Sequence, residues 1–238
     1  MADTTKCAIV VLAAGAGTRM KSAKQKTLHE IGGRPLIGHA LHAAAGMHPG
    51  KLVAVVGHQR EQVSPAIEAI AAELGTEVSQ AVQEEQNGTG HAVQCGLEPL
   101  PDFDGTVIVT NGDVPLLRTE TIRGLFDAHV TAGNAVTVLS MQLADPTGYG
   151  RIVRGADGNV EAIVEQKDAA SEQLSINEVN SGVFAFDGAI LRDALTKLDS
   201  NNAQGELYIT DVLEIARTAG HNVGAHIAAD AGELAGVN

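Results

Sequence analysis

This sequence has few basic residues. The 238 residues include 16 Lys and Arg against 29 Asp and Glu, which gives a net charge of −13 at pH 7. A surplus of negative charge repels a polyanion. The composition therefore excludes a general nucleic-acid binder and a protein that adsorbs to anionic membranes, and it favours a small molecule as the partner.

Cysteines and long apolar runs are also few. Cys7 and Cys95 lie far apart and form neither a Cys-x-x-Cys pair nor a disulfide framework, so we expect two buried, reduced thiols. The apolar run at 8–14 is too short for a membrane span or for the apolar core of a signal peptide. The nine histidines form no zinc-binding spacing. These features predict a cytoplasmic protein without a membrane anchor.

The apolar residues that are present alternate between strand-like and helix-like segments. Residues 8–12 and 53–56 are continuously apolar, which is typical of strands buried on both faces of a parallel sheet. The pattern predicts a doubly wound, Rossmann-like α/β fold with a mixed, mostly parallel sheet. We expect strands at 8–12, 52–56, 77–82, 106–110 and 135–139, and helices at 35–45, 61–74, 90–97, 119–132, 189–195 and 210–218.

The pattern changes after about residue 140. Residues 149–154, 160–165 and 179–186 read as strands separated by Gly and Asp turns instead of long helices. No linker or repeat divides the chain. We therefore expect a single domain, residues 1–238, with a first lobe at about 1–140 and a smaller lobe at about 141–225.

A glycine-rich turn follows the first expected strand, in the sequence LAAGAGTRM (12–20). Gly15 and Gly17 permit backbone conformations and close approaches that a Cβ would obstruct, so exposed amides can form a nest for phosphate oxygens. The turn lacks the Gly-Lys-Ser/Thr of a P-loop. Met20 stands where a dinucleotide fingerprint needs its third glycine, which disfavours a nicotinamide oxidoreductase.

Much of the scarce positive charge follows this turn. Five of the 16 basic residues fall within 16 positions: Arg19, Lys21, Lys24, Lys26 and Arg34. Cations next to a phosphate-binding turn favour a triphosphate or pyrophosphate ligand. The turn and the charges together predict a nucleotide site.

Several motifs resemble the sugar-phosphate nucleotidyltransferase family. Within it, the chain is similar to the uridylyltransferase domain of bifunctional bacterial N-acetylglucosamine-1-phosphate uridylyltransferase/glucosamine-1-phosphate acetyltransferases, over essentially its whole length. The motifs occur in the family's order: LAAGAGTRM (12–20) with Lys26, Gln83 with GTGHA (88–92), GDVPL (112–116), DPTGYGRI (145–152), EQKDA (165–169), EVNSG (178–182), NNAQGELYITD (201–211) and GVN (236–238).

The resemblance implies a reaction and a set of partners. UMP would be transferred from UTP to N-acetylglucosamine 1-phosphate, giving UDP-N-acetylglucosamine and pyrophosphate for cell-wall precursors. The full relatives continue into a left-handed β-helix acetyltransferase domain, through which they trimerise. No hexapeptide repeat of that kind occurs here. We therefore expect a mostly monomeric chain without acetyltransferase activity.

The resemblance also implies site residues. The phosphates would meet Arg19 and Lys26, and the nucleotide would lie along the backbone from Leu12 through Ala13 and Ala14 to Gly15. Gln83, Gly88 and Thr89 would read the uracil. The remaining residues implied are the sugar-binding Gly150, Glu165 and Asn180 and the Mg²⁺ ligands Asp113 and Asn238.

Two positions depart from the family pattern. The family usually has proline before the lysine, whereas Gln25 stands here, so we expect a less rigid loop and a less firmly placed Lys26. Asn111 occupies a position that varies among relatives. Two alternatives stay open. Because the phosphate-binding residues are shared across the family, the chain could be another sugar-1-phosphate nucleotidyltransferase that uses dTTP, CTP or GTP. Because of Gln25 and the terminal position of Asn238, it could also be a module that binds nucleotide sugars without turnover.

Overall fold

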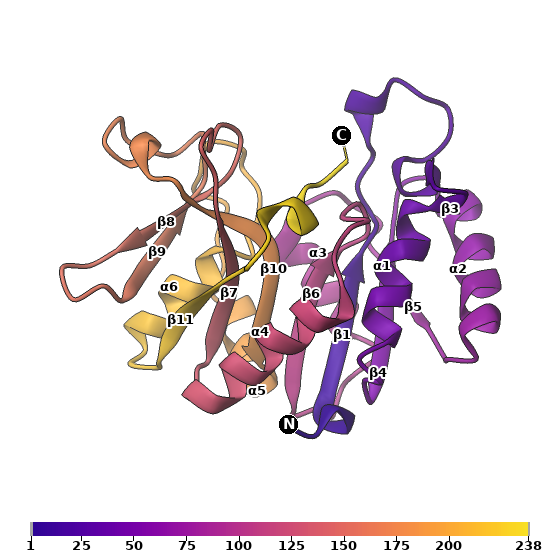
Figure 1. The fold of residues 1–238 in the computed structure, drawn as a ribbon, viewed down its shortest axis with the longest axis horizontal. Helices are drawn as coiled ribbons and strands as arrows, with labels where there is room; N and C mark the ends of the chain where they lie inside the picture. Colours follow the sequence, from indigo (N-terminus) through magenta and orange to yellow (C-terminus); the bar gives the residue numbers. More distant parts are fainter. Residues whose placement is uncertain (1, 238) are drawn as a thin grey trace.

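The architecture is a mixed β-sheet covered by helices on both faces (Figure 1). It is taken from a computed structural model that describes residues 2–237. In the described chain the main sheet has nine strands, ordered β11-β7-β10-β6-β1-β4-β5, with β8 joined to β10 and β9 to β8. The strands are β1 (Cys7–Leu12), β4 (Lys51–Val56), β5 (Ser79–Val82), β6 (Thr106–Asn111), β7 (Val136–Gln142), β8 (Arg151–Arg154), β9 (Val160–Val164), β10 (Glu178–Asp187) and β11 (Val223–Ile227). A separate small hairpin pairs β2 (Glu30–Ile31) with β3 (Arg34–Pro35).

The helices form two layers because alternate residues of each central strand face opposite cores. Ile9 of β1 packs in the core that includes α1 (Leu36–Ala45), α2 (Arg60–Leu74) and α4 (Thr119–Ala132). Val10 faces the core that includes α3 (Thr89–Leu97), α5 (Gly188–Leu195) and α6 (Asp211–Thr218). Both strand faces are therefore buried, as the continuous apolar run predicts.

The sheet brings the site motifs to one edge. β1 pairs in parallel with β4 on one side and with β6 on the other. In open α/β sheets, ligands bind beyond the carboxyl ends of the strands where the order reverses, and β1 and β6 flank such a point. The loops that follow these two strands, 13–25 and 112–118, carry the glycine-rich turn and Asp113.

The second half of the chain is built into the same sheet. β10 pairs antiparallel with β6, β7 and β8, and its register with β7 shifts between Asn180 and Val183. β8 and β9 form an antiparallel hairpin that projects to one side in Figure 1. This arrangement confirms the mixed sheet expected after residue 140. No described helix is long and apolar enough to cross a membrane.

The sequence predicts most elements to within two residues, and the differences have physical causes. β11 escapes prediction because Val-Gly-Ala-His-Ile carries little strand signal, and it is a half-buried edge strand. The expected strand at 77–82 begins only at Ser79. Cys7 and Cys95 are buried and free, as expected, and burial raises the pKa of the Cys7 thiol to about 12.

Candidate functional site

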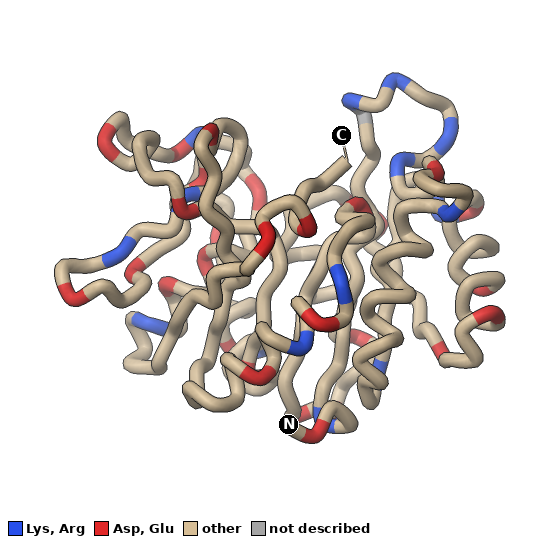
Figure 2. Tube along the Cα trace, in the orientation of Figure 1, with Lys and Arg blue, Asp and Glu red and all other residues tan. Residues whose placement is uncertain are grey.

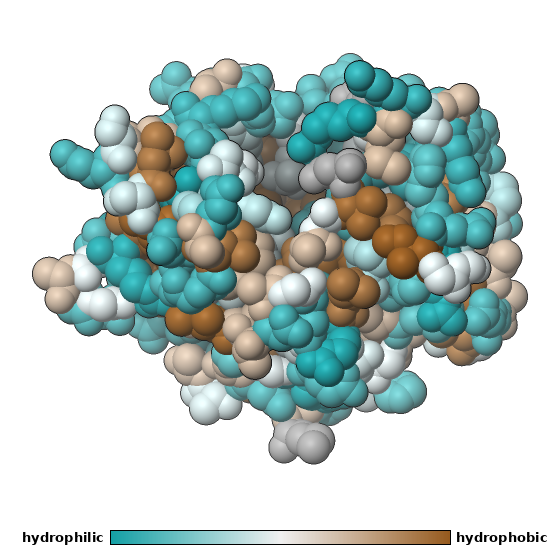
Figure 3. Space-filling view, turned by 45° about the horizontal axis from the view of Figure 1, so that its top comes forward, coloured by the Kyte–Doolittle hydropathy of each residue, from teal (hydrophilic) through white to brown (hydrophobic). Residues whose placement is uncertain are grey.

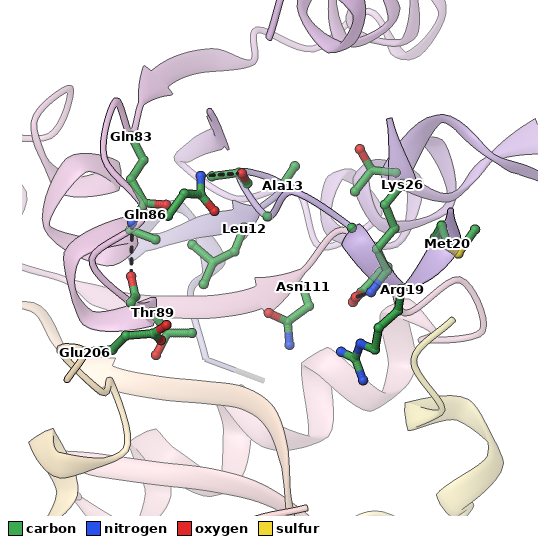
Figure 4. A pocket seen from close by; sticks show the side chains of 17 residues that line it. Leu12, Ala13, Arg19, Met20, Lys26, Gln83, Gln86, Thr89, Asn111 and Glu206 are labelled. Carbon is green, nitrogen blue, oxygen red and sulfur yellow. Dashed lines mark hydrogen bonds and ion pairs between the residues drawn. The ribbon is translucent and has the colours of Figure 1, made fainter. Parts of the chain in front are cut away.

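A cavity of about 320 Å³ opens at the carboxyl ends of β1 and β6. Figure 3 shows a hollow in the surface of the molecule, and Figure 4 shows the cavity from close by. All the residues that the sequence assigns to nucleotide and phosphate line it together. The lining residues are Leu12, Ala13, Ala14, Gly15, Gly17, Arg19, Met20, Lys26, Thr27, Gln83, Gln86, Gly88, Thr89, Ala92, Asn111, Asp113 and Glu206.

The two glycines of the turn have different roles. Gly17 has a φ of +59°, and a Cβ there would overlap the Cβ of Lys26, so both backbone conformation and packing require glycine. A Cβ at Gly15 would have no protein atom within 4 Å, and the backbone there needs no positive φ. The missing side chain of Gly15 therefore leaves space in the cavity, where a ligand can approach the backbone.

Hydrogen bonds fix the backbone before this turn. The Ala13 N–H donates to the Val55 carbonyl at 2.8 Å, and the Gln86 amide donates to the Ala14 carbonyl at 2.7 Å. Among the described residues, the N–H groups of Ala14 and Gly15 have no acceptor. The backbone is therefore held in place while the Ala14 and Gly15 N–H groups can donate to an anion, as in a phosphate-binding nest.

Lys26 forms an ion pair with Asp113 at one end of the cavity. Lys26 Nζ lies 2.5 Å from Asp113 Oδ2, and the two side chains are 12% and 27% exposed. Lys26 begins the short 3-10 helix Lys26–Leu28, whereas Asp113 follows β6. Arg19 points into the same space beside them (Figure 4). Figure 2 shows the basic positions gathered on the loop after β1.

Asp113 is the described residue best suited to a metal ion. Its carboxylate faces the cavity, and hard oxygen ligands suit Mg²⁺, which takes only one or two carboxylates and fills its shell with phosphate oxygens and water. The described residues contain no group of three or more His, Cys, Asp or Glu that could enclose an ion by themselves. The donor set therefore fits a metal that is shared with a phosphate ligand. Asn238, the second ligand that the resemblance implies, lies outside the described residues.

The C-terminal segment is attached beside Asp113. The Val237 N–H donates to the Asp113 carbonyl at 2.9 Å. Four residues upstream, the buried Glu233 carboxylate accepts hydrogen bonds from Arg118 and from the Thr121 hydroxyl of α4. These bonds hold the pKa of Glu233 below its usual value, although burial opposes them. The described C-terminal segment, up to Val237, thus approaches the site from a fixed anchor.

Gln83 lies at the opposite end of the cavity from Lys26 (Figure 4). It is 4% exposed, and its Nε2 donates to the Gly88 carbonyl at 3.0 Å and contacts His91 Nδ1 at 3.3 Å. Both described hydrogen-bond contacts of the Gln83 side chain are made by Nε2. The amide is therefore oriented with Oε1 as the acceptor left for a ligand.

The loop around Gly88 is clamped to the segment that precedes α6. The Leu207 N–H donates to the Asn87 carbonyl at 2.9 Å, and the Gly90 N–H donates to the Leu207 carbonyl at 2.7 Å. The Thr89 hydroxyl accepts the Ile209 N–H at 3.1 Å. The Thr89 side chain thus contributes to this clamp as well as lining the cavity.

The three residues assigned to the sugar lie together but outside the lining of this cavity. The Asn180 N–H donates to the Gly150 carbonyl at 2.8 Å, and a Cβ at Gly150 would lie 3.2 Å from Glu165 Oε1. Burial raises the pKa of Glu165, and the nearby carboxylates of Asp211 and Asp168 raise it further. The cluster is a polar surface with a carboxylate that readily accepts hydrogen bonds from hydroxyl groups.

Asn111 connects the cavity to this cluster. Its Nδ2 donates to the Gly182 carbonyl at 3.3 Å, and the Gly182 N–H donates to Asn180 Oδ1 at 2.8 Å. Gly182 has a φ of +81° at the irregularity in β10. The two groups of predicted residues are therefore joined by a short chain of hydrogen bonds.

Sequence reasoning missed three polar residues of the cavity, Thr27, Gln86 and Glu206. Gln86 supports the Ala14 carbonyl, and Glu206 is held by Asn202, whose Nδ2 donates to the Glu206 carbonyl at 2.6 Å. Glu206 belongs to the NNAQGELYITD motif, which could have drawn attention to it. Gln86 carries no signal of its own in a polar loop.

Gln25, which stands where the family usually has proline, is held in the loop by its own side chain. Gln25 is 2% exposed, and its Nε2 donates to the Gly15 carbonyl at 3.0 Å. Its Oε1 accepts both the backbone N–H and the hydroxyl of Thr27 at 2.6 Å. A glutamine at this position is tied into the loop by its side chain, which the comparison with proline did not foresee.

Comparison with known proteins agrees with the resemblance that the sequence motifs indicate. The bifunctional protein GlmU of Corynebacterium aurimucosum is 76% identical over 238 residues, which cover all of this chain and 49% of that protein. The same protein of Corynebacterium diphtheriae is 68% identical and that of Streptomyces avermitilis 58%, again over the whole chain and 49% of the relative. The chain therefore spans about half the length of the curated relatives it matches.

Solved structures share the fold at low sequence identity. A UDP-glucose pyrophosphorylase complexed with UDP-glucose superposes with a TM-score of 0.73 at 19% identity, covering 92% of this chain and 89% of the other. A putative glucose-1-phosphate thymidylyltransferase from Bacillus anthracis gives 0.76 at 20% identity, covering 95% and 90%. The MobA-like NTP transferase domain family matches residues 9–171. The chain therefore belongs to the MobA-like NTP transferase family.

Proposed function

We propose that the chain transfers UMP from UTP to N-acetylglucosamine 1-phosphate, giving UDP-N-acetylglucosamine and pyrophosphate. The observation that carries the proposal is one cavity with Lys26 and Asp113 at one end and the oriented Gln83 amide at the other. Relatives of 58–76% identity across the whole chain carry the name bifunctional protein GlmU, which agrees with a transferase of this kind.

The phosphate end of the cavity can bind a triphosphate. Arg19 and Lys26 supply positive charge, and the N–H groups of Ala14 and Gly15 supply donors along the turn. Charge-assisted hydrogen bonds to phosphate are short and strong. Positive charge at this end neutralises the departing pyrophosphate, which is the main demand of phosphoryl chemistry.

The base end of the cavity favours uracil over cytosine. Gln83 Oε1 is an acceptor, and uracil presents an N–H donor at N3 whereas cytosine presents an acceptor. A site built for one hydrogen-bond pattern rejects a base that leaves its buried polar group unpaired. Thymine has the same N3–H, so this contact alone also accepts dTTP. Thymidylyl transfer is therefore the second candidate function.

The sugar phosphate would lie between the cavity and the cluster of Gly150, Glu165 and Asn180. Glu165 accepts hydrogen bonds from sugar hydroxyls, while the Asn180 amide can both donate and accept. The Asn111 contact to Gly182 links this cluster to the nucleotide cavity. This placement leaves the sugar's phosphate facing the α-phosphate of the nucleotide.

The reaction needs positioning more than acid–base chemistry. An oxygen of the sugar phosphate attacks the α-phosphorus, a new P–O bond forms, the bond to the β-phosphate oxygen breaks, and pyrophosphate leaves with the electron pair. The attacking oxygen is already anionic, so no residue has to remove a proton. Lys26 and Arg19 hold the phosphates in line. Mg²⁺ held by Asp113, with Asn238 as the proposed second ligand, would neutralise charge on the triphosphate when bound.

The experiment is pyrophosphate release from UTP with N-acetylglucosamine 1-phosphate and Mg²⁺. Parallel reactions contain dTTP, CTP or GTP, or glucose 1-phosphate instead of the acetylated sugar. We expect turnover with UTP and the acetylated sugar that a chelator abolishes. Gln83→Leu should raise the KM for UTP about tenfold or more by removing the acceptor, whereas Gln80→Leu in β5, the strand that ends just before Gln83, should not. Equal turnover with CTP and UTP would contradict the proposal.

A further inference from the structure

Gln25 is a buried polar side chain that the proposed reaction does not use directly. We propose that it is a positioning residue, which closes the basic loop after the glycine-rich turn and thereby places Lys26 at the phosphates. The inference rests on the proposed function for the part that concerns catalysis. Its structural part, the closure of the loop, can be tested independently of turnover.

The Gln25 side chain connects Gly15 and Thr27, two residues of the loop that are twelve positions apart in sequence. At one side, its Nε2 donates to the Gly15 carbonyl at 3.0 Å. At the other, its Oε1 accepts the Thr27 N–H and hydroxyl, each at 2.6 Å, and so caps the 3-10 helix that begins at Lys26. One amide therefore ties the turn to the start of the helix that carries the lysine.

The Thr27 end of this connection is buried. Gln25 and Thr27 are 2% and 4% exposed, so water has little access to the Thr27 N–H when the amide is removed, whereas Gly15 is exposed. A buried carbonyl or N–H without a partner is costly, which favours the closed loop over open alternatives. The residues between, which include Arg19, Lys21 and Lys24, are mostly exposed.

Lys26 sits at the point where the closure acts. Gly17 packs directly against the Lys26 stem, where a Cβ would overlap, and Lys26 Nζ reaches Asp113. The aliphatic part of the Lys26 side chain thus packs against Gly17, while the Gln25 side-chain amide caps the 3-10 helix that begins at Lys26. Displacing a catalytic group by about 1 Å can lower the rate about 10²-fold. Loss of the Gln25 amide should have an effect of this kind.

Proline, which the resemblance leads us to expect at this position, would restrict the same backbone by a different means. Gln25 has a φ of −58°, which lies within the range that a proline ring imposes. Its N–H donates weakly to Gln62 Oε1 at 3.3 Å, a bond that proline would lose. Gln25→Pro should therefore keep part of the placement that Gln25→Ala loses.

The test compares Gln25→Ala, Gln25→Pro and a matched control, Gln94→Ala. Gln94 also donates a side-chain amide to a backbone carbonyl, that of Leu195 at 2.9 Å, but it does not line the cavity. Hydrogen exchange of residues 15–28 is measured in the whole chain for each variant. Pyrophosphate release is measured with UTP and N-acetylglucosamine 1-phosphate, and kcat and KM are separated.

We expect Gln25→Ala to speed hydrogen exchange of residues 15–28 about tenfold or more. It should also lower kcat/KM about tenfold to 10²-fold. The melting temperature should change no more than it does in Gln94→Ala. Gln25→Pro should recover part of the slow hydrogen exchange and part of kcat/KM. Unchanged exchange at 15–28 in Gln25→Ala would overturn the inference, whatever the activity. Faster exchange with unchanged kcat and KM would overturn the role in placing Lys26. If the parent chain shows no turnover, the proposed function fails, and the exchange result still decides whether Gln25 closes the loop.

Discussion

Lys26 Nζ and Asp113 Oδ2 are 2.5 Å apart, so the lysine proposed for the phosphates and the carboxylate proposed for the metal form an ion pair with each other. A bound metal and triphosphate would replace this ion pair with two new ones. Asp113 would contact the metal, and Lys26 would contact a phosphate. The pairing keeps two opposite charges in place before the ligand arrives.

The ion pair predicts that Lys26→Ala separates catalysis from metal binding. Turnover should fall about 10²–10³-fold, by analogy with the loss of one preorganised donor at a transition state. Binding of a divalent cation at Asp113, measured with Mn²⁺ by electron paramagnetic resonance, should be retained or tightened because a competing cation has been removed. Lys24→Ala is the control, since Lys24 is exposed and pairs only loosely with Glu30 at 3.6 Å. Weaker Mn²⁺ binding in Lys26→Ala would contradict this account.

The two glycines of the turn should respond differently to alanine. Gly17→Ala forces an L residue into a φ of +59° and pushes against Lys26, so we expect a loss of stability of about 1–2 kcal/mol together with a loss of turnover. Gly15→Ala adds a methyl group to open space, so stability should be unchanged while the KM for UTP rises. Urea unfolding and steady-state kinetics check both. Equal loss of stability in the two variants would show that this distinction is wrong.

Much of this site follows from the sequence because it depends on local pattern. The buried apolar run before the glycine-rich turn places Gly15 at a strand end, and the motif order brings Asp113 to the neighbouring strand end. The Gln25 contacts could not be predicted, because they join Gly15 and Thr27 through a side chain whose direction depends on the folded loop. Gln86 and the half-buried β11 were missed for related reasons, since tertiary contacts define them and local propensity does not.

The anchoring of the C-terminal segment should affect the metal site at a distance. Glu233→Ala removes the acceptor for Arg118 and Thr121 and releases the segment whose Val237 N–H donates to the Asp113 carbonyl. We expect the Mg²⁺ concentration for half-maximal activity to rise about three- to tenfold, because loss of a charge-assisted hydrogen bond costs about 1.5–3 kcal/mol, of which only part reaches the metal site. Glu120→Ala is the control, since Glu120 lies on α4 next to Thr121. An unchanged Mg²⁺ requirement in Glu233→Ala would contradict the proposed link.

Asp211 should make the fold less stable as pH rises. Burial raises its pKa to about 6 from 3.8, and the carboxylates of Asp199, Glu214 and Asp168 add to the shift. The folded chain therefore binds more protons than the unfolded chain between about pH 4 and pH 6, so this group's contribution to stability declines across that window.

Removing the charge should therefore stabilise the protein at neutral pH. Because the Asp211 carboxylate is only partly buried and water screens it, we expect Asp211→Asn to add about 1 kcal/mol at pH 8 and close to nothing at pH 4. Urea unfolding at both pH values measures the difference. Asp193→Asn is the control, since Asp193 is exposed and pairs with Lys197 on the surface. A gain at pH 4 equal to that at pH 8 would rule out this titration as the cause.

The central claim is the transfer of the α-phosphate of UTP to a sugar phosphate, and labelled UTP tests it most directly. The chain is incubated with N-acetylglucosamine 1-phosphate, Mg²⁺ and UTP that carries ³²P at either the α- or the γ-position, and the products are separated. We expect the α-label in UDP-N-acetylglucosamine, the γ-label in pyrophosphate, and loss of both products with Lys26→Ala. Release of the γ-label as inorganic phosphate, or of the α-label as free UMP without sugar nucleotide, would contradict the claim.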